Sequence, residues 1–193
     1  MDRRDFIKTT TAAAAMTGAR TLKSAPSAKR HPDLIKTENA KSGASFQLTR
    51  MMPDSAKSYR TSLIEGYCSR QSIKAGEKLD IFVSTKPVSK FTIDIFRMGY
   101  YGGAGSRLMT KLGPIEGKEQ PVPEMADKRL RECRWEVSTS LVIPADWPSG
   151  VYLGRLATVP AAADKPYWQS YVIFIVKDDR PADILFQCSD NTW

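Results

Sequence analysis

Residues 78–96 have the sequence KLDIFVSTKPVSKFTIDIF, in which two apolar stretches are separated by a break that contains lysine and proline. The alternating apolar positions are Leu79, Ile81 and Val83 in the first stretch and Phe91, Ile93 and Ile95 in the second. Successive side chains of a β-strand point to opposite faces, so a period of two gathers each set on one face. The segment therefore predicts two β-strands, each with one apolar face.

Four further segments have the same character and are separated by breaks rich in Gly, Pro and Lys. They are residues 64–68, 141–143, 151–156 and 171–176, and residues 72–77 are predicted to form a turn that leads into 78–84. Six or seven short strands in about 120 residues are typical of a two-sheet sandwich of immunoglobulin or fibronectin type. We therefore predict an all-β fold for residues 59–179, with no long amphipathic helix and with residues 144–150 as a bend before a late strand.

The positive charge of the chain is concentrated near its N-terminus. The formal net charge is +8, but residues 1–50 hold ten Lys and Arg against four Asp and Glu, and residues 51–193 hold nineteen against seventeen. A nearly neutral body without a nucleic-acid-binding motif predicts no nucleic-acid partner. The single histidine, His31, precedes the strands. Its position excludes a histidine-dependent triad or a histidine-rich zinc site within the body.

The first residues are predicted to direct export. Arg3 and Arg4 are followed by Phe6 and Lys8 and then by a mildly apolar, Ala- and Thr-rich stretch. This order resembles a twin-arginine signal peptide, which we assign to residues 1–28, with cleavage after Ala19 or near residues 25–28. The stretch is too short to span a bilayer, so no stable membrane anchor is predicted. We expect a periplasmic or secreted protein, with residues 29–58 as a linker or N-terminal arm.

The three cysteines, Cys68, Cys133 and Cys188, lack the spacing of a metal site. No zinc site is therefore predicted. An odd number leaves at least one thiol unpaired. A Cys68–Cys133 disulfide and buried free thiols that act as small hydrophobic groups both remain open.

Three motifs in the body resemble the family of the large (beta) subunit of N,N-dimethylformamidase. The most distinctive is FTIDIFRMGYYGGAG at residues 91–105. IEGY at residues 64–67 and IPADWPSGVY at residues 143–152 agree with it in the same order, and the resemblance extends from Ile64 to Trp193.

This resemblance implies that the β-sandwich precedes an α/β domain similar to glutamine amidotransferases. That domain would carry an iron ion, held by tyrosines and a carboxylate, that activates water to hydrolyse the C–N bond of an amide. Residues 180–193, which contain the apolar run Ile184-Leu185-Phe186, resemble the first strand of that domain, truncated here. No residue of the chain matches the iron ligands. We therefore expect no cofactor in this chain, no activity of the chain alone, and the missing α/β domain and further subunits as partners.

Four residues are candidates for an interaction surface: Arg97, Tyr100, Tyr101 and Trp147. The glycine-rich stretch 99–105 lacks both phosphate-binding patterns and is predicted to connect a hairpin, with its two tyrosines as an alternative aromatic surface. Arg97 is expected to pair with a carboxylate, either on the surface of the sheet or on the missing domain. The tryptophan between two prolines either covers the open end of the sandwich core or stacks on a carbohydrate.

Two functional hypotheses follow from these observations. The first is a non-catalytic sandwich that packs on or shields the hydrolytic domain of an exported amide hydrolase. The second is a self-standing periplasmic binding module with an exposed aromatic patch of Tyr100, Tyr101, Trp147 and Trp168. Cys188 and Asp190 occupy the end of the last predicted strand, where α/β enzymes place catalytic residues, and are assigned no catalytic role here.

Overall fold

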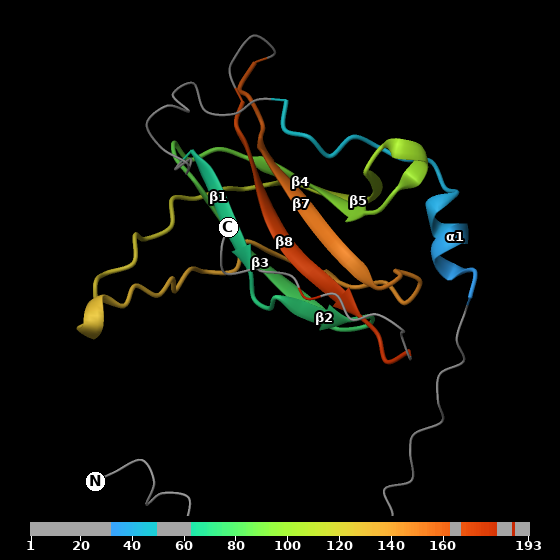
Figure 1. Ribbon diagram of the computed structural model, residues 1–193. Helices are drawn as coiled ribbons and strands as arrows, with labels where there is room; N and C mark the ends of the chain where they lie inside the picture. The colour runs from blue at the N-terminus through green and yellow to red at the C-terminus, as the bar shows by residue number, and fades with distance from the viewer. Residues whose placement is uncertain (1–31, 50–62, 163–166, 181–186, 188–193) are drawn as a thin grey trace, which may run out of the picture.

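The alternating segments form two β-sheets that enclose one apolar core in the computed structural model, which describes residues 32–49, 63–162, 167–180 and 187 (Figure 1). One sheet has the strand order β1-β3-β6, formed by Ile64–Cys68, Lys78–Thr85 and Thr139–Val142. The other has the order β2-β8-β7-β4-β5, formed by Ser72–Lys74, Gln169–Lys177, Gly150–Thr158, Phe91–Met98 and Ser106–Ile115. The described helices are short: α1 (Leu34–Asn39), η1 (Tyr101–Gly103) and η2 (Asp127–Arg129). The predicted all-β sandwich is confirmed.

The alternation seen in the sequence places the core. The six alternating apolar residues of 78–96 are fully buried: Leu79, Ile81, Val83, Phe91, Ile93 and Ile95. In the larger sheet, Tyr152 and Phe174 lie directly opposite each other on β7 and β8 and complete this core. Along most of β3, β4, β7 and β8, every second side chain is thus buried, as a period of two requires.

Two strands were not predicted. Residues 72–74, expected within a turn, form β2, which pairs in parallel with the end of β8 and buries Ile73 in the core. Three residues are too few to show a period, so only the turn at Gly76, with φ of 83°, was recognisable. The sequence pattern did not predict β5, because it is an edge strand whose pairing with β4 shifts register at two positions. Such irregularities interrupt the alternation of side chains.

Residues 32–49, which fall in the predicted linker or N-terminal arm, lie against the outward face of the five-stranded sheet. After α1, the cyan stretch in Figure 1 runs from β5 across β7 to β8. Its hydrogen bonds join Ala44 to Ser106, Ser45 and Gln47 to Arg155, Phe46 to Tyr171, and Thr49 to Gln169. This part of the chain is therefore attached to the sandwich by polar contacts. Residues 50–58 lie outside the described residues.

The connection from β5 to β6 extends away from the sandwich as two extended segments that meet at η2 (Figure 1). The Trp135 indole N–H donates a hydrogen bond to the carbonyl oxygen of Pro121, which joins the two segments. The Trp135 ring also contacts Tyr67, which attaches them to β1. Within the described residues, no helix is both long and apolar enough to cross a membrane. The predicted signal peptide, residues 1–28, lies outside the described residues.

Candidate functional site

A buried cluster of charged and phenolic groups lies where β4 ends. Arg97 is 4% exposed, and its guanidinium group donates hydrogen bonds to the Tyr101 hydroxyl (2.8 Å) and to the carbonyl oxygen of Ser149 (2.9 Å). The Tyr101 hydroxyl donates in turn to Oε1 of Glu38 (2.9 Å). Nε of Arg107 donates to the same carboxylate oxygen (2.8 Å). The cluster therefore joins α1, the β4–β5 connection, β5 and the bend before β7.

The glycine-rich stretch 99–105 connects β4 to β5, so the predicted hairpin is confirmed. Positive φ angles occur at Tyr101, Gly102, Gly103 and Gly105. At Gly99, a Cβ atom would lie 2.7 Å from Cε2 of Tyr101 and 2.9 Å from Oδ1 of Asn39. That same Oδ1 accepts the backbone N–H of Tyr100 (2.9 Å). Only glycine allows this close approach, which docks α1 on the hairpin.

The structure contradicts the predicted aromatic surface. Tyr100 is 70% exposed, but Arg97, Tyr101 and Trp147 are buried. Trp147 stacks on Tyr152 at a ring-centroid distance of 5.0 Å and belongs to the core, as the sandwich-covering alternative predicted. Trp168 is half-buried and lines a groove elsewhere. The four-residue patch of the binding-module hypothesis is therefore not formed, because indole and phenol rings pack against the core when they can satisfy their polar atoms there.

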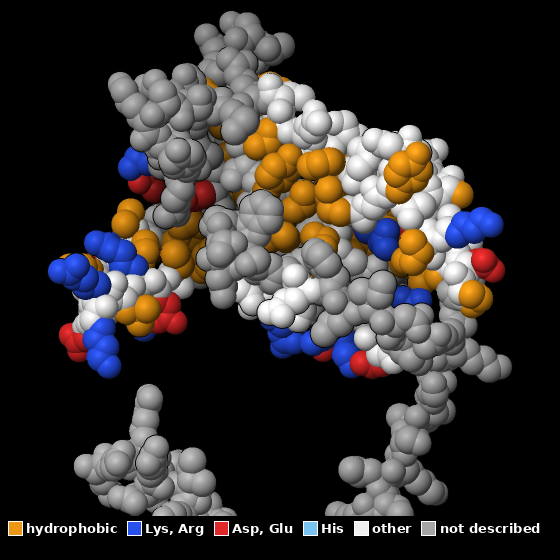
Figure 2. Space-filling view, viewed as in Figure 1, with side chains coloured by type: hydrophobic (Ala, Val, Ile, Leu, Met, Phe, Trp, Pro, Cys, Tyr) orange, Lys and Arg blue, Asp and Glu red, His pale blue; other side chains and the backbone are white. Residues whose placement is uncertain are grey.

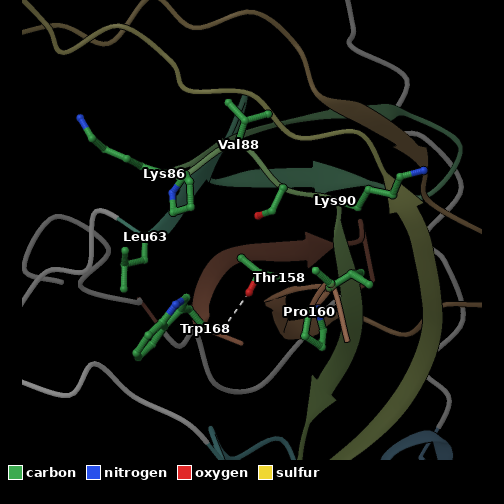
Figure 3. Close-up of a pocket in the computed structure, with 11 residues that line it drawn as sticks. Leu63, Lys86, Val88, Lys90, Thr158, Pro160 and Trp168 are labelled. Atoms are coloured by element: carbon green, nitrogen blue, oxygen red, sulfur yellow. Dashed lines mark hydrogen bonds between the residues drawn. The ribbon is translucent and has the colours of Figure 1, made fainter. Parts of the chain in front are cut away.

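A groove of about 650 Å³ lies at one end of the sandwich (Figure 3). It is lined by Leu63, Lys86, Pro87, Val88, Ser89, Lys90, Thr158, Val159, Pro160, Ala161 and Trp168. The charged side chains among these are Lys86 and Lys90, which pair with Glu119 (2.6 Å) and Glu116 (2.7 Å). Its lining offers apolar surface and two ammonium groups that are each paired with a glutamate, so the described groove resembles a packing surface more than a catalytic pocket.

A comparison with known families identifies the chain. The model of the family described as N,N-dimethylformamidase beta subunit-like, C-terminal, matches residues 92–193. The chain belongs to this family. The match begins within β4, contains the hairpin of the buried cluster and continues past β8. It confirms the resemblance predicted from the sequence over these residues, and no curated protein matches the chain.

Within this dimethylformamidase-like chain, the buried cluster does not fit the iron that the resemblance implies. Glu38 and Tyr101 offer a carboxylate and a phenol, the donor types expected of that site. However, Arg97 donates to the Tyr101 hydroxyl and Arg107 donates to the Glu38 carboxylate, so a guanidinium group lies on each of these oxygens, where its positive charge opposes a metal cation. Burial raises the pKa of Tyr101, which keeps the phenol protonated. Among the described residues, no three or more His, Cys, Asp or Glu side chains are grouped to hold a metal.

The ionisation of Glu38 reflects its partners. Burial opposes the negative charge of this carboxylate, but hydrogen bonds from Lys41 and Tyr101 and the charge of Arg107 outweigh it and hold the pKa below its ordinary value. A native pKa below that of the unfolded chain means that the ionised carboxylate stabilises the fold. Glu38 and Arg107 were not among the candidates from the sequence, because they meet across 69 positions and neither carries a local signal.

We predict that the stability of the chain is acid-sensitive through Glu38. The carboxylate contributes its full stabilisation above the ordinary pKa of 4.5 and loses it as the pH falls through the lower native value. The Glu38→Gln variant should be less stable than the wild type at pH 7, and the difference should shrink towards pH 3. Urea unfolding across this pH range measures it. A difference that stays constant with pH would contradict the assignment.

The cysteines of this family member are free where the structure describes them. Cys68 and Cys133 form no disulfide, and of the two thiols only that of Cys68 packs against the core, so the alternative of buried free thiols fits Cys68 and not Cys133. Burial raises the pKa of the Cys68 thiol to about 12, so this residue behaves as a small apolar side chain. Cys133 is exposed on the connection between β5 and β6. Cys188 and Asp190 lie outside the described residues.

Proposed function

We propose that this chain supplies the non-catalytic β-sandwich of an exported, N,N-dimethylformamidase-like amide hydrolase. The observation that carries the proposal is the family match, which runs from β4 through β8 and continues to residue 193. The region that the family shares thus includes strands of the sandwich as well as the segment that follows them. The family is named after a subunit, so partner subunits are expected.

In this proposal, hydrolysis belongs to the α/β domain that begins at residues 180–193. Iron bound there would polarise and activate water for attack on the amide carbon. The residues of the sandwich have a positioning role. The Arg97–Tyr101–Glu38 chain of hydrogen bonds keeps the arm, the hairpin and the bend at Ser149 in one arrangement, on which a neighbouring domain can be held.

The proposal is tested by measuring iron content and hydrolysis of N,N-dimethylformamide with the purified 193-residue chain. The same measurements are made on the chain extended through the coding sequence downstream of Trp193. We expect iron and amide hydrolysis only in the extended protein. Stoichiometric iron or turnover in the 193-residue chain would show that its own residues build the active site, and would refute the proposal.

We further propose export by the twin-arginine route, which the Arg3-Arg4 pair supports. Replacing both residues, Arg3→Lys with Arg4→Lys, should leave the protein in the cytoplasm with its leader uncleaved, because this route requires the arginine pair. Cell fractionation followed by mass measurement detects both changes. Arg20→Lys is the matched control and should be exported normally. Unchanged export of the double variant would reject this route.

A further inference from the structure

The helix at the start of the N-terminal arm, residues 32–49, has little to stabilise it by itself. Asp33 at the N-cap of α1 makes no side-chain capping hydrogen bond, and Ile35 is 51% exposed. Figure 2 shows basic, acidic and hydrophobic side chains together on the surface around α1, at the right of the view. The buried residue of α1 is Glu38, which is 3% exposed. Because so short a helix is unstable alone in water, α1 depends on the contacts that hold this carboxylate.

Two donors of the sandwich converge on one oxygen of the Glu38 carboxylate. Oε1 accepts hydrogen bonds from the Tyr101 hydroxyl (2.9 Å) and from Nε of Arg107 on β5 (2.8 Å). Oε2 pairs with Nζ of Lys41 (2.7 Å), which belongs to the arm itself. The guanidinium group of Arg97 donates to the Tyr101 hydroxyl and cannot accept, so this hydroxyl gives its own hydrogen to Glu38. Hydrogen bonds between a charged donor and a carboxylate are among the stronger ones in proteins.

The hairpin between β4 and β5 positions these donors without help from the arm. Arg97 and Arg107 lie directly opposite each other in the pairing of β4 with β5. The backbone N–H of Gly99 donates to the carbonyl oxygen of Gly105 (3.1 Å) and closes the connection that carries Tyr101. Like charges directly opposite each other destabilise a pair of strands. The two arginines therefore favour an anion beside them, and the arm supplies one.

We infer that the Tyr101 hydroxyl and Nε of Arg107 form a carboxylate-binding site, which Glu38 occupies as a ligand carried by the arm. Arg97 has a positioning role in this site, since it orients the Tyr101 hydroxyl. Without the carboxylate, α1 detaches from the hairpin while the sandwich stays folded. Attachment to the same chain gives Glu38 a high effective concentration, so a free carboxylate competes poorly with it. A small free carboxylate binds where the side chain of Glu38 has been removed.

The test uses the 193-residue chain with Glu38→Ala, which removes a methylene and the carboxylate group and so leaves a space that matches acetate. The amides of Thr37 and Ala40 close the turns of α1, and that of Ala44 donates to the carbonyl oxygen of Ser106. Hydrogen exchange of these amides reports whether the arm is docked. It should accelerate by about tenfold or more in Glu38→Ala and slow again, with saturation, as sodium acetate is added at constant ionic strength. Acetamide, which has a similar shape and no charge, should have no effect.

Two further variants locate the effect. Glu132→Ala is the matched control, because it removes an exposed glutamate that pairs with Arg134 at 3.3 Å, and it should leave the exchange of α1 unchanged. Combining Glu38→Ala with Arg107→Ala should abolish the response to acetate, because the charged donor of the site is then absent.

Four outcomes would overturn the carboxylate site: no response to acetate in Glu38→Ala, an equal response to acetamide, a response that persists without Arg107, or equal acceleration in Glu132→Ala. Amides of β4 and β7 report the sandwich itself. Their accelerated exchange together with α1 in Glu38→Ala would show that the arm does not open separately, and would overturn that part of the inference. These measurements use neither amide hydrolysis nor iron, so their outcome is separate from that of the functional test.

Discussion

Tyr152→Ala is expected to lower the free energy of unfolding by about 3–5 kcal/mol, the range for truncating a large buried aromatic residue. The Tyr152 ring is fully buried between Trp147 and Phe174, at centroid distances of 5.0 Å and 5.4 Å. Its hydroxyl donates a hydrogen bond to the carbonyl oxygen of Pro148 (2.6 Å). Truncation opens a cavity between the sheets and leaves that carbonyl without a partner. Urea unfolding followed by tryptophan fluorescence measures the change.

The Tyr152→Phe variant separates packing from hydrogen bonding. It keeps the ring stack and removes only the hydroxyl, so it should cost about 1–2 kcal/mol. A loss from Tyr152→Ala no larger than that from Tyr152→Phe would show that the stack with Trp147 contributes little, and would contradict the central place of this ring in the core.

Arg97→Ala is expected to lower the free energy of unfolding by about 2–4 kcal/mol, because it leaves buried acceptors without donors and removes a buried side chain. The Ser149 carbonyl and the Tyr101 hydroxyl both lose the guanidinium group. Burial matters here because a surface arginine in an ion pair contributes little. We also expect Arg97→Lys to recover only part of the loss, since one ammonium group cannot reproduce the planar, two-acceptor geometry.

The matched control for Arg97 is Arg134→Ala, which removes an exposed arginine paired with Glu132 at 3.3 Å. Its cost should stay within about 0.5 kcal/mol. Equal losses for the two alanine variants, measured by the same urea unfolding, would mean that the buried cluster does not hold the arm and the hairpin together.

The fold was predictable where strands are long and bury one face. Residues 78–96 show their period of two because every second side chain enters the core, and this pattern survives in the structure as β3 and β4. β2 and β5 were missed for different reasons. β2 has three residues, and β5 lies at an edge where register shifts and half-exposed side chains interrupt the alternation. Edge strands need no strict pattern, because only one side of their backbone is paired.

The candidate site was predictable only in part. The motif at residues 91–105 identified the family and the hairpin, because glycines at positive φ mark a tight connection in the sequence itself. The same residues were also candidates for an exposed surface, and for Arg97 and Tyr101 this was wrong. Their partner is Glu38, which lies 63 positions from Tyr101 on a helix that the sequence did not predict. A buried arginine looks identical to an exposed one until its acceptors are known.

The amino-acid sequence alone therefore determined the all-β sandwich, its core-facing positions, the hairpin and the family, since these depend on periodicity and on local backbone geometry. Tertiary structure alone decided which polar residues are buried and that residues 32–49 bind the outward face of the larger sheet. These features depend on contacts between segments far apart in the chain. Such contacts balance desolvation against hydrogen bonding, and no local pattern records that balance.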